Sequence, residues 1–170
     1  MPLASFVIIK LAQIISMKGF WILLAILLLS ACAEPKPNYP EMDLMKHGLP
    51  IKIHAPIDAE VEMNDMLLMK DVTVKKDKFY LQIFSSEAMV NDVAKIKADK
   101  LNEVKSKSSF SKIIQDDPSG FIFEKLRSDS TANYDFRQIK IQGDKQYIFQ
   151  TGLIGKFSEQ EVRDMYESVQ

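Results

Sequence analysis

An apolar run near the N-terminus divides this 170-residue chain into two unlike parts. Residues 1–31 hold no Asp or Glu, and their only charged side chains are Lys10 and Lys18. The run over residues 19–29 is shorter than the roughly 20 apolar residues of a spanning helix. A positive end, a short apolar run and a small-residue boundary are typical of a secretory signal. We therefore predict that residues 1–31 are removed and take no part in the mature fold.

The chain from Cys32 onward has the composition of an ordinary soluble domain. It holds 20 basic and 23 acidic side chains, a formal charge of −3. A body of this length buries its own core without metal or disulfide staples, so one domain is expected. The acidic balance and the single cysteine argue against a disulfide scaffold and against a nucleic-acid binder that relies on positive charge.

The boundary itself carries a more specific motif. Leu29-Ser30-Ala31-Cys32 resembles the lipobox of bacterial lipoproteins. This resemblance implies cleavage between Ala31 and Cys32 and a lipid attached to Cys32. Two or three acyl chains would anchor the protein stably, whereas one chain binds only marginally. The alternative is an uncleaved N-terminal anchor with Cys32 as a small buried residue. Translation from Met1 and translation from Met17 both fit the motif.

Residues 32–47 are predicted to be the lipidated cysteine followed by a tether. Pro35, Pro37 and Pro40 favour an extended, semi-rigid segment. The predicted location is the bacterial cell envelope, on a membrane. Ala33 stands where an Asp retains lipoproteins at the inner membrane of enteric bacteria, which favours the outer membrane.

Residues 48–170 are predicted to be a single α+β domain. Period-two alternation indicates strands, and the expected strands cover residues 51–55, 67–75, 79–84, 110–114, 121–123, 134–142 and 146–153. The Ser85-Ser86 pair is expected to cap a long helix that ends near Lys107. Ser158 and Glu161 form a capping box, and Phe157 is placed to staple onto Val162, which predicts a C-terminal helix.

The expected architecture is an antiparallel sheet of about six strands with one long helix and one C-terminal helix packed on it. This order of elements resembles the PsbP-like α/β sandwich over residues 48–170. The resemblance implies an accessory, non-catalytic binding protein, and it assigns no site residue.

The sequence offers no motif for catalysis, so no catalytic residue and no cofactor are predicted. His54 lies on the polar side of its expected strand, and His47 lies at the end of the tether. Asp116, Asp117 and Ser119 are read as formers of the turn around Pro118. Hydrolase elbows, zinc-binding helices and phosphate loops have no counterpart in the sequence.

Two function classes remain open. The favoured hypothesis is a membrane-anchored interaction module that binds another envelope protein or a cell-wall component and does not bind nucleic acid. The alternative is a small-ligand or copper-binding lipoprotein. Its ligand would lie in a cavity lined by the aromatic residues Phe79, Phe121, Phe123 and Tyr134. Its copper would bind the thioethers of Met63, Met66 and Met69, because soft sulfur ligands select Cu(I). Core filling is the simpler role for such methionines.

Overall fold

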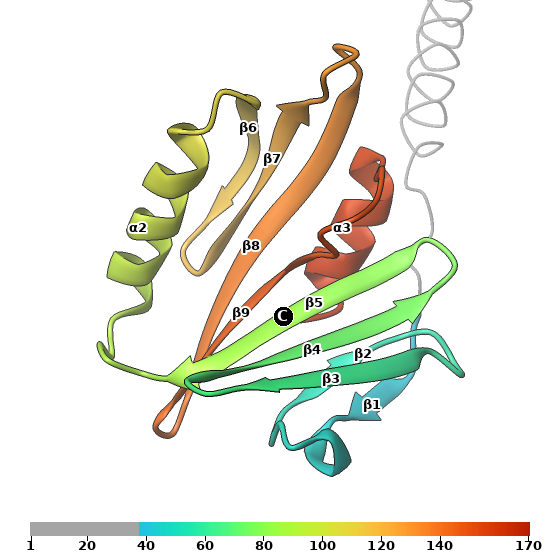
Figure 1. Ribbon diagram of the computed structural model, residues 1–170, viewed down its shortest axis with the longest axis vertical. Coiled ribbons are helices and arrows are strands. Elements are labelled where there is room, and N and C mark those ends of the chain that lie inside the picture. The colour runs from blue at the N-terminus through green and yellow to red at the C-terminus, as the bar shows by residue number, and fades with distance from the viewer. Residues whose placement is uncertain (1–37) are drawn as a thin grey trace, which may run out of the picture. The chain divides into compact units, whose positions relative to one another are not determined.

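The computed structural model describes residues 38–170 (Figure 1). These residues belong to one compact unit. The unit holds its own hydrophobic cores, as a domain that folds independently does. Ala31, Cys32 and the predicted cleavage site between them lie outside the described residues.

Within residues 38–170, seven strands form one antiparallel sheet in the order β3-β4-β5-β9-β8-β7-β6. Their bounds are β3 (Glu60–Met66), β4 (Met69–Lys76), β5 (Phe79–Glu87), β6 (Phe110–Asp117), β7 (Gly120–Leu126), β8 (Ala132–Gln142) and β9 (Lys145–Thr151). The α+β class and the antiparallel sheet agree with the sequence, which predicted about six strands. The seventh strand, β3, was not predicted.

A short strap precedes the large sheet. It consists of β1 (Glu41–Asp43), the single 3-10 turn η1 (Met45–His47) and β2 (Lys52–His54). Leu44 and Leu49 of the strap are fully buried against the sheet. The compact unit therefore begins before the predicted boundary at residue 48, because apolar side chains of the expected tether belong to the core.

The long helix α2 (Val93–Lys105) begins later than the sequence indicates. Asp92 caps it by accepting a hydrogen bond from the Lys95 amide at 3.0 Å. The predicted caps, Ser85 and Ser86, instead lie in β5 and pair with β9. The prediction of the helix start was wrong because sheet pairing outweighs the capping preference of serine.

The C-terminal helix α3 (Glu159–Glu167) confirms the predicted capping box. The Ser158 amide donates to the Glu161 carboxylate at 2.7 Å, and the Glu161 amide donates to the Ser158 hydroxyl at 3.3 Å. Val162, Met165 and Tyr166 of this helix are buried.

The two helices cover opposite faces of the sheet. The face that we call the α3 face carries the main core, in which Ile122 and Phe136 join the strap and α3. The α2 face carries a smaller core, in which Phe121 and Phe123 pack with Val104 of α2. Alternation along β7 thus sends neighbouring side chains to different cores. In Figure 1, α3 lies behind the sheet, and the strands turn progressively from β6 to β3.

Candidate functional site

The α2 face contains a cavity of about 200 Å³ beside the C-terminal end of α2. Its wall combines apolar side chains with cationic and amide groups. Its lining residues are Val104, Lys107, Ser109, Phe110, Phe123, Lys125, Asp135, Arg137, Gln150, Thr151, Gly152 and Leu153. We call it the cationic cleft, because its lining includes the three cations Lys107, Lys125 and Arg137 and one carboxylate, that of Asp135.

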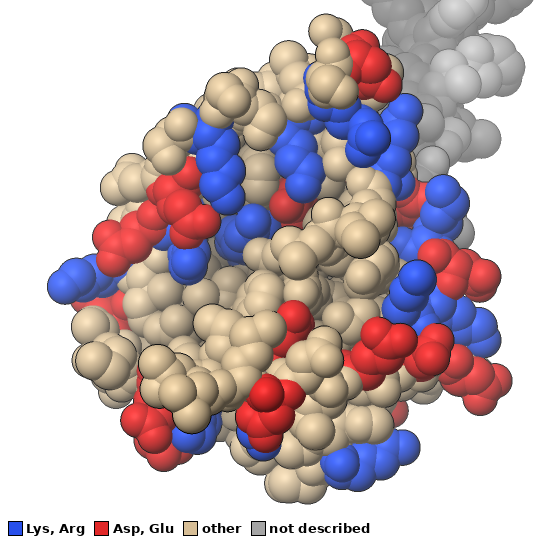
Figure 2. Space-filling view, viewed as in Figure 1, with Lys and Arg blue, Asp and Glu red and all other residues tan. Residues whose placement is uncertain are grey.

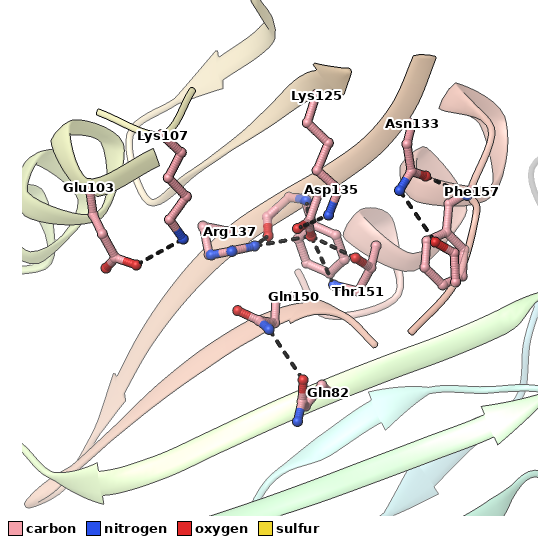
Figure 3. Close-up of polar contacts among 12 residues, drawn as sticks. Gln82, Glu103, Lys107, Lys125, Asn133, Asp135, Arg137, Gln150, Thr151 and Phe157 are labelled. Atoms are coloured by element: carbon pink, nitrogen blue, oxygen red, sulfur yellow. Dashed lines mark hydrogen bonds and ion pairs between the residues drawn. The ribbon is translucent and has the colours of Figure 1, made fainter. Parts of the chain in front are cut away.

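Asp135 organises the floor of the cationic cleft. Its Oδ1 accepts hydrogen bonds from the Thr151 hydroxyl at 2.7 Å and from the Phe136 amide at 2.8 Å. Lys125 Nζ lies 2.9 Å from Oδ2, and Arg137 Nη1 lies 3.0 Å from Oδ1. Figure 3 shows both cations converging on this carboxylate. Burial is the strongest single influence on Asp135 and opposes its ionisation. The charges of Arg137 and Lys125, together with the hydrogen bonds from Thr151 and Lys125, outweigh burial, so the pKa of Asp135 lies below its usual range.

Arg137 is held in place from several directions. Its side chain is only 9% exposed, and its guanidinium lies 5.4 Å from the centroid of the Phe123 ring. Within residues 38–170, its hydrogen bonds run from Nη1 to Asp135 and to the Phe136 carbonyl. Lys107 stands at the more exposed rim and pairs with Glu103 at 3.3 Å. The cleft thus has one buried cation and two more accessible ones.

A row of buried polar side chains continues across the α2 face from the cleft. Gln150 donates to the side-chain oxygen of Gln82 at 3.2 Å. Gln82 in turn donates to both carboxylate oxygens of Asp71 at 3.0 Å. These residues come from β9, β5 and β4, so the row links three adjacent strands and satisfies its polar groups internally.

A second cavity, of about 320 Å³, opens near the turn between β4 and β5. We call it the lysine cavity. Its lining residues are Lys75, Asp77, Lys78, Tyr80, Ile154, Gly155, Lys156 and Phe157. Lys75 Nζ lies 5.0 Å from the centroid of the Tyr80 ring, and Tyr80 meets Phe157 edge-on at 6.4 Å. Three lysines face one aspartate here, so this cavity is also net positive.

The segment that joins β9 to α3 separates the two cavities. We call residues 152–157 the β9–α3 loop. Leu153 borders the cationic cleft and is 75% exposed, and Ile154 borders the lysine cavity and is 83% exposed. The Gly152 amide donates to the Tyr80 carbonyl at 2.7 Å. A Cβ on Gly152 would lie 2.4 Å from the Tyr80 ring, so only glycine fits this close approach.

The two cavities and the loop form one face of unusual charge. Their lining residues include six lysines and arginines but only two aspartates, on a body that is acidic as a whole. Figure 2 shows cationic side chains gathered over the upper part of the view, along β7, β8 and the adjoining loops. Two exposed apolar residues therefore stand between two cationic cavities.

A separate apolar surface lies at the tip of the β3–β4 hairpin. Leu67 is 98% exposed and Leu68 is 84% exposed, and Met66 and Met69 flank them. We call residues 66–69 the apolar tip. Two-residue hairpin turns favour Gly, Asn or Asp, so two leucines at this turn contradict the local preference. Such departures from local rules concentrate at functional sites.

The structure separates the residues of the two alternative ligand sites. Phe79 belongs to the core of the α3 face and Tyr134 packs against that core, whereas Phe121 and Phe123 belong to the core of the α2 face. The predicted aromatic cavity is therefore wrong, because strand alternation divides its members between the two faces.

The three methionines of the copper hypothesis are also divided. Met66 pairs directly with Met69 across the hairpin, whereas Met63 pairs with Val72. Side chains three residues apart on a strand point to opposite faces, so Met63 and Met66 do not share a face. In the described part of the chain, no group of three or more His, Cys, Asp or Glu residues could hold a metal ion.

The remaining candidate residues occupy peripheral positions. His54 is exposed, and its Nδ1 lies 2.9 Å from the Tyr39 carbonyl. His47 ends η1. Asp116 and Asp117 end β6 rather than lying in the turn. Among residues 38–170, no helix is long and apolar enough to cross a membrane.

The residues of the cationic cleft were not singled out by the sequence. They come from the end of α2 and the turn after it, from β6, β7, β8 and β9, and from the β9–α3 loop, so they span residues 104–153. The one local signal is Asp135-Phe136-Arg137, in which two charged residues flank a core residue in a strand. No family model, curated protein or solved structure matches the chain.

Proposed function

We propose that this chain is a bacterial envelope lipoprotein whose folded domain is a non-catalytic interaction module. In this proposal residues 1–31 are a leader, Cys32 carries the lipid, and the following prolines hold the domain close to a membrane. The outer membrane is favoured, because Ala33 follows the cysteine. The resemblance of the element order to the PsbP-like sandwich points to the same accessory role.

The observation that carries this proposal is the apolar tip and its position. Tyr39, at the start of the described chain, packs edge-on against Phe79 with ring centroids 5.3 Å apart. Phe79 begins β5 beside the end of β4, whereas Met69 begins β4 at the apolar tip. Since β4 runs Met69–Lys76, the two ends are roughly 24 Å apart at about 3.4 Å per residue. The tip therefore points away from the side on which a tether would arrive.

The chemistry of the tip suits a protein partner. Burying one leucine side chain contributes about 1.5–3 kcal/mol, so Leu67 and Leu68 together would supply a useful anchor. Apolar anchors that fill pockets dominate the binding energy of many interfaces. The flexible thioethers of Met66 and Met69 adapt to an irregular partner surface. We therefore propose an envelope protein with an apolar pocket as the partner.

Intact-mass analysis of the membrane-extracted protein tests the anchor. The expected species begins at Cys32 and carries two or three acyl chains. An exported protein with a free thiol at position 32 and an intact leader would refute the lipoprotein assignment.

Photo-crosslinking tests the partner. A photoreactive amino acid replaces Leu68 in the full chain, and the matched control replaces Met89, an apolar side chain that is 91% exposed and lines neither cavity. One adduct of reproducible mass is expected from position 68 and not from position 89. The captured protein, once purified, is expected to bind residues 33–170, and Leu67→Asp is expected to weaken that binding at least tenfold. Equal capture from both positions, or no effect of Leu67→Asp, contradicts the proposal.

A further inference from the structure

We propose that the β9–α3 loop and its two flanking cavities seat on an anionic lipid surface, with the lysines on headgroup phosphates and Leu153 and Ile154 in the acyl boundary. The seat and the apolar tip would then lie on different parts of the domain, one for the membrane and one for the partner. This inference rests on the proposed function for the bilayer to which the domain is tethered.

The first argument is charge complementarity. The lysine cavity contains Lys75, Lys78 and Lys156 against Asp77. On the other side of the loop, Arg137 and Lys125 share the single carboxylate of Asp135, so the cationic cleft keeps a positive balance. Lys107 lies at its rim, where Glu103 partly offsets its charge. Asp135 is already occupied by Arg137 and Lys125, so it does not repel a phosphate as a free carboxylate would. Basic clusters next to a membrane anchor are attracted to anionic headgroups.

The second argument is the combination of that charge with exposed apolar side chains. Leu153 and Ile154 are adjacent, exposed and central between the cations. An apolar centre with a basic rim is the arrangement of interfacial membrane binders. The loop is held firmly at its start, because the Gly152 amide donates a hydrogen bond to the Tyr80 carbonyl. An ordered loop presents these side chains without a large loss of conformational entropy on binding.

The third argument is where the described chain begins. Tyr39 contacts Phe79, which precedes Tyr80, and the Tyr80 carbonyl accepts the Gly152 amide. The β9–α3 loop therefore lies at the end of the sheet where the chain arrives. In an extended polyproline form, the segment from Cys32 to Asn38 would span roughly 19 Å at about 3.1 Å per residue. A tether of this length keeps the loop within reach of the surface that holds Cys32, and this favours lipid as the occupant.

The test uses residues 33–170, which contain the compact unit with both of its hydrophobic cores. Its vesicles are made of phosphatidylcholine with or without an equal part of phosphatidylglycerol. The sole tryptophan of the chain is Trp21, so this fragment has no tryptophan background. Ile154→Trp is expected to shift its emission to the blue with the anionic vesicles only. Leu68→Trp, the matched reporter at the apolar tip, is expected to show no shift. A shift at Leu68 and none at Ile154 overturns the proposal.

Charge variants test the lysines. Lys78→Gln combined with Lys156→Gln is expected to lower vesicle partitioning about 25-fold, or about fivefold for each lysine. The matched control, Lys140→Gln with Lys145→Gln, makes the same change of net charge on the β8–β9 hairpin and is expected to lower it far less. Equal losses in the two pairs refute a localised seat.

Inorganic phosphate distinguishes a lipid headgroup from a free anion. Phosphate binding to the lysine cavity without any vesicle binding would identify a small-anion site and overturn the lipid assignment. Because the fragment lacks Cys32, failure here leaves the acylation of that residue to the intact-mass measurement. The two proposals therefore fail separately.

Discussion

Replacing Asp135 with asparagine removes the carboxylate on which the cationic cleft is built. The substitution keeps the shape of the side chain but leaves Arg137 and Lys125 as buried or half-buried cations without their counter-ion. An amide group cannot satisfy all the donors that Asp135 accepts from Thr151, Phe136 and the two cations. Removing one partner of a buried ion pair costs about 3–5 kcal/mol, a large part of the roughly 5–15 kcal/mol that stabilises a domain.

Urea unfolding of residues 33–170, followed by circular dichroism, measures this cost. With a slope of about 1.5 kcal/mol per molar urea, the midpoint of Asp135→Asn is expected to fall by roughly 2–3 M. Asp129→Asn is the matched control, since Asp129 is exposed and its main partners are the amide and hydroxyl of Thr131. Its midpoint is expected to change far less. A loss below about 1 kcal/mol for Asp135→Asn would refute the view that this carboxylate holds the cleft together.

The same variant has a pH signature. Because the pKa of Asp135 is lowered in the folded state, its contribution is fully present above the unfolded pKa of about 3.9. The contribution is lost as the pH falls through the folded-state pKa. The stability difference between the natural protein and Asp135→Asn is therefore expected to be largest near neutral pH and to shrink below about pH 4. A difference that stays constant down to pH 2 would contradict this reasoning.

Three further substitutions test other parts of the fold and are read by urea or thermal unfolding. Ser158→Ala is expected to cost about 1 kcal/mol, because it removes the cap of α3; an unchanged midpoint would show that the capping box is dispensable. Leu67→Ser is expected to stay within about 0.5 kcal/mol, because the side chain is almost fully exposed; a larger loss would mean that the apolar tip is structural. Tyr166 has its pKa raised by burial and by its hydrogen bond to Asp117 at 2.9 Å. The stability that this raised pKa contributes is fully present below the unfolded pKa of about 10 and is lost as the pH rises from there towards the folded-state pKa. The stability of Tyr166→Phe is therefore expected to fall less steeply above pH 10 than that of the natural protein. An identical fall would refute this assignment.

Local chemistry made the C-terminal helix predictable. Ser158 and Glu161 satisfy each other's backbone amides, and Val162, Met165 and Tyr166 repeat on one side of the helix. Short-range spacing decides both features. The hairpin around Gly143 was equally predictable from the sequence. Gly143 has a positive φ of 62° in a two-residue turn, and this preference of glycine is a local property.

The missed strand and the misplaced helix start depended on tertiary contacts. β3 reads Glu-Val-Glu-Met-Asn-Asp-Met and is exposed along most of its length, so it lacks the alternation of a half-buried strand. Pairing with β4 fixes it as an edge strand. Ser85 and Ser86 have the chemistry of a cap, yet their backbone groups pair with β9 instead.

The candidate surfaces were hidden from the sequence for different reasons. In the cationic cleft, Lys107 comes from the turn after α2, Lys125 from β7 and Arg137 from β8. The pairing of β7 with β8 and the packing of α2 on β8 bring these residues together. The two leucines of the apolar tip are adjacent in the sequence, but they were included in the strand predicted over residues 67–75. Knowing that Leu67 and Leu68 form a turn required the register of β3 with β4.

The strap has a mechanical consequence. The Ala55 amide donates to the Pro40 carbonyl at 3.1 Å, and Leu44 and Ile53 are buried in the main core with Val72 and Val74 of β4. Tension applied to the N-terminal side of the described chain would therefore act directly on the main hydrophobic core, through the buried side chains of the strap. Detaching the strap would expose Val72 and Val74 of β4. A force strong enough to detach it would therefore expose apolar surface that favours aggregation before the whole domain unfolds.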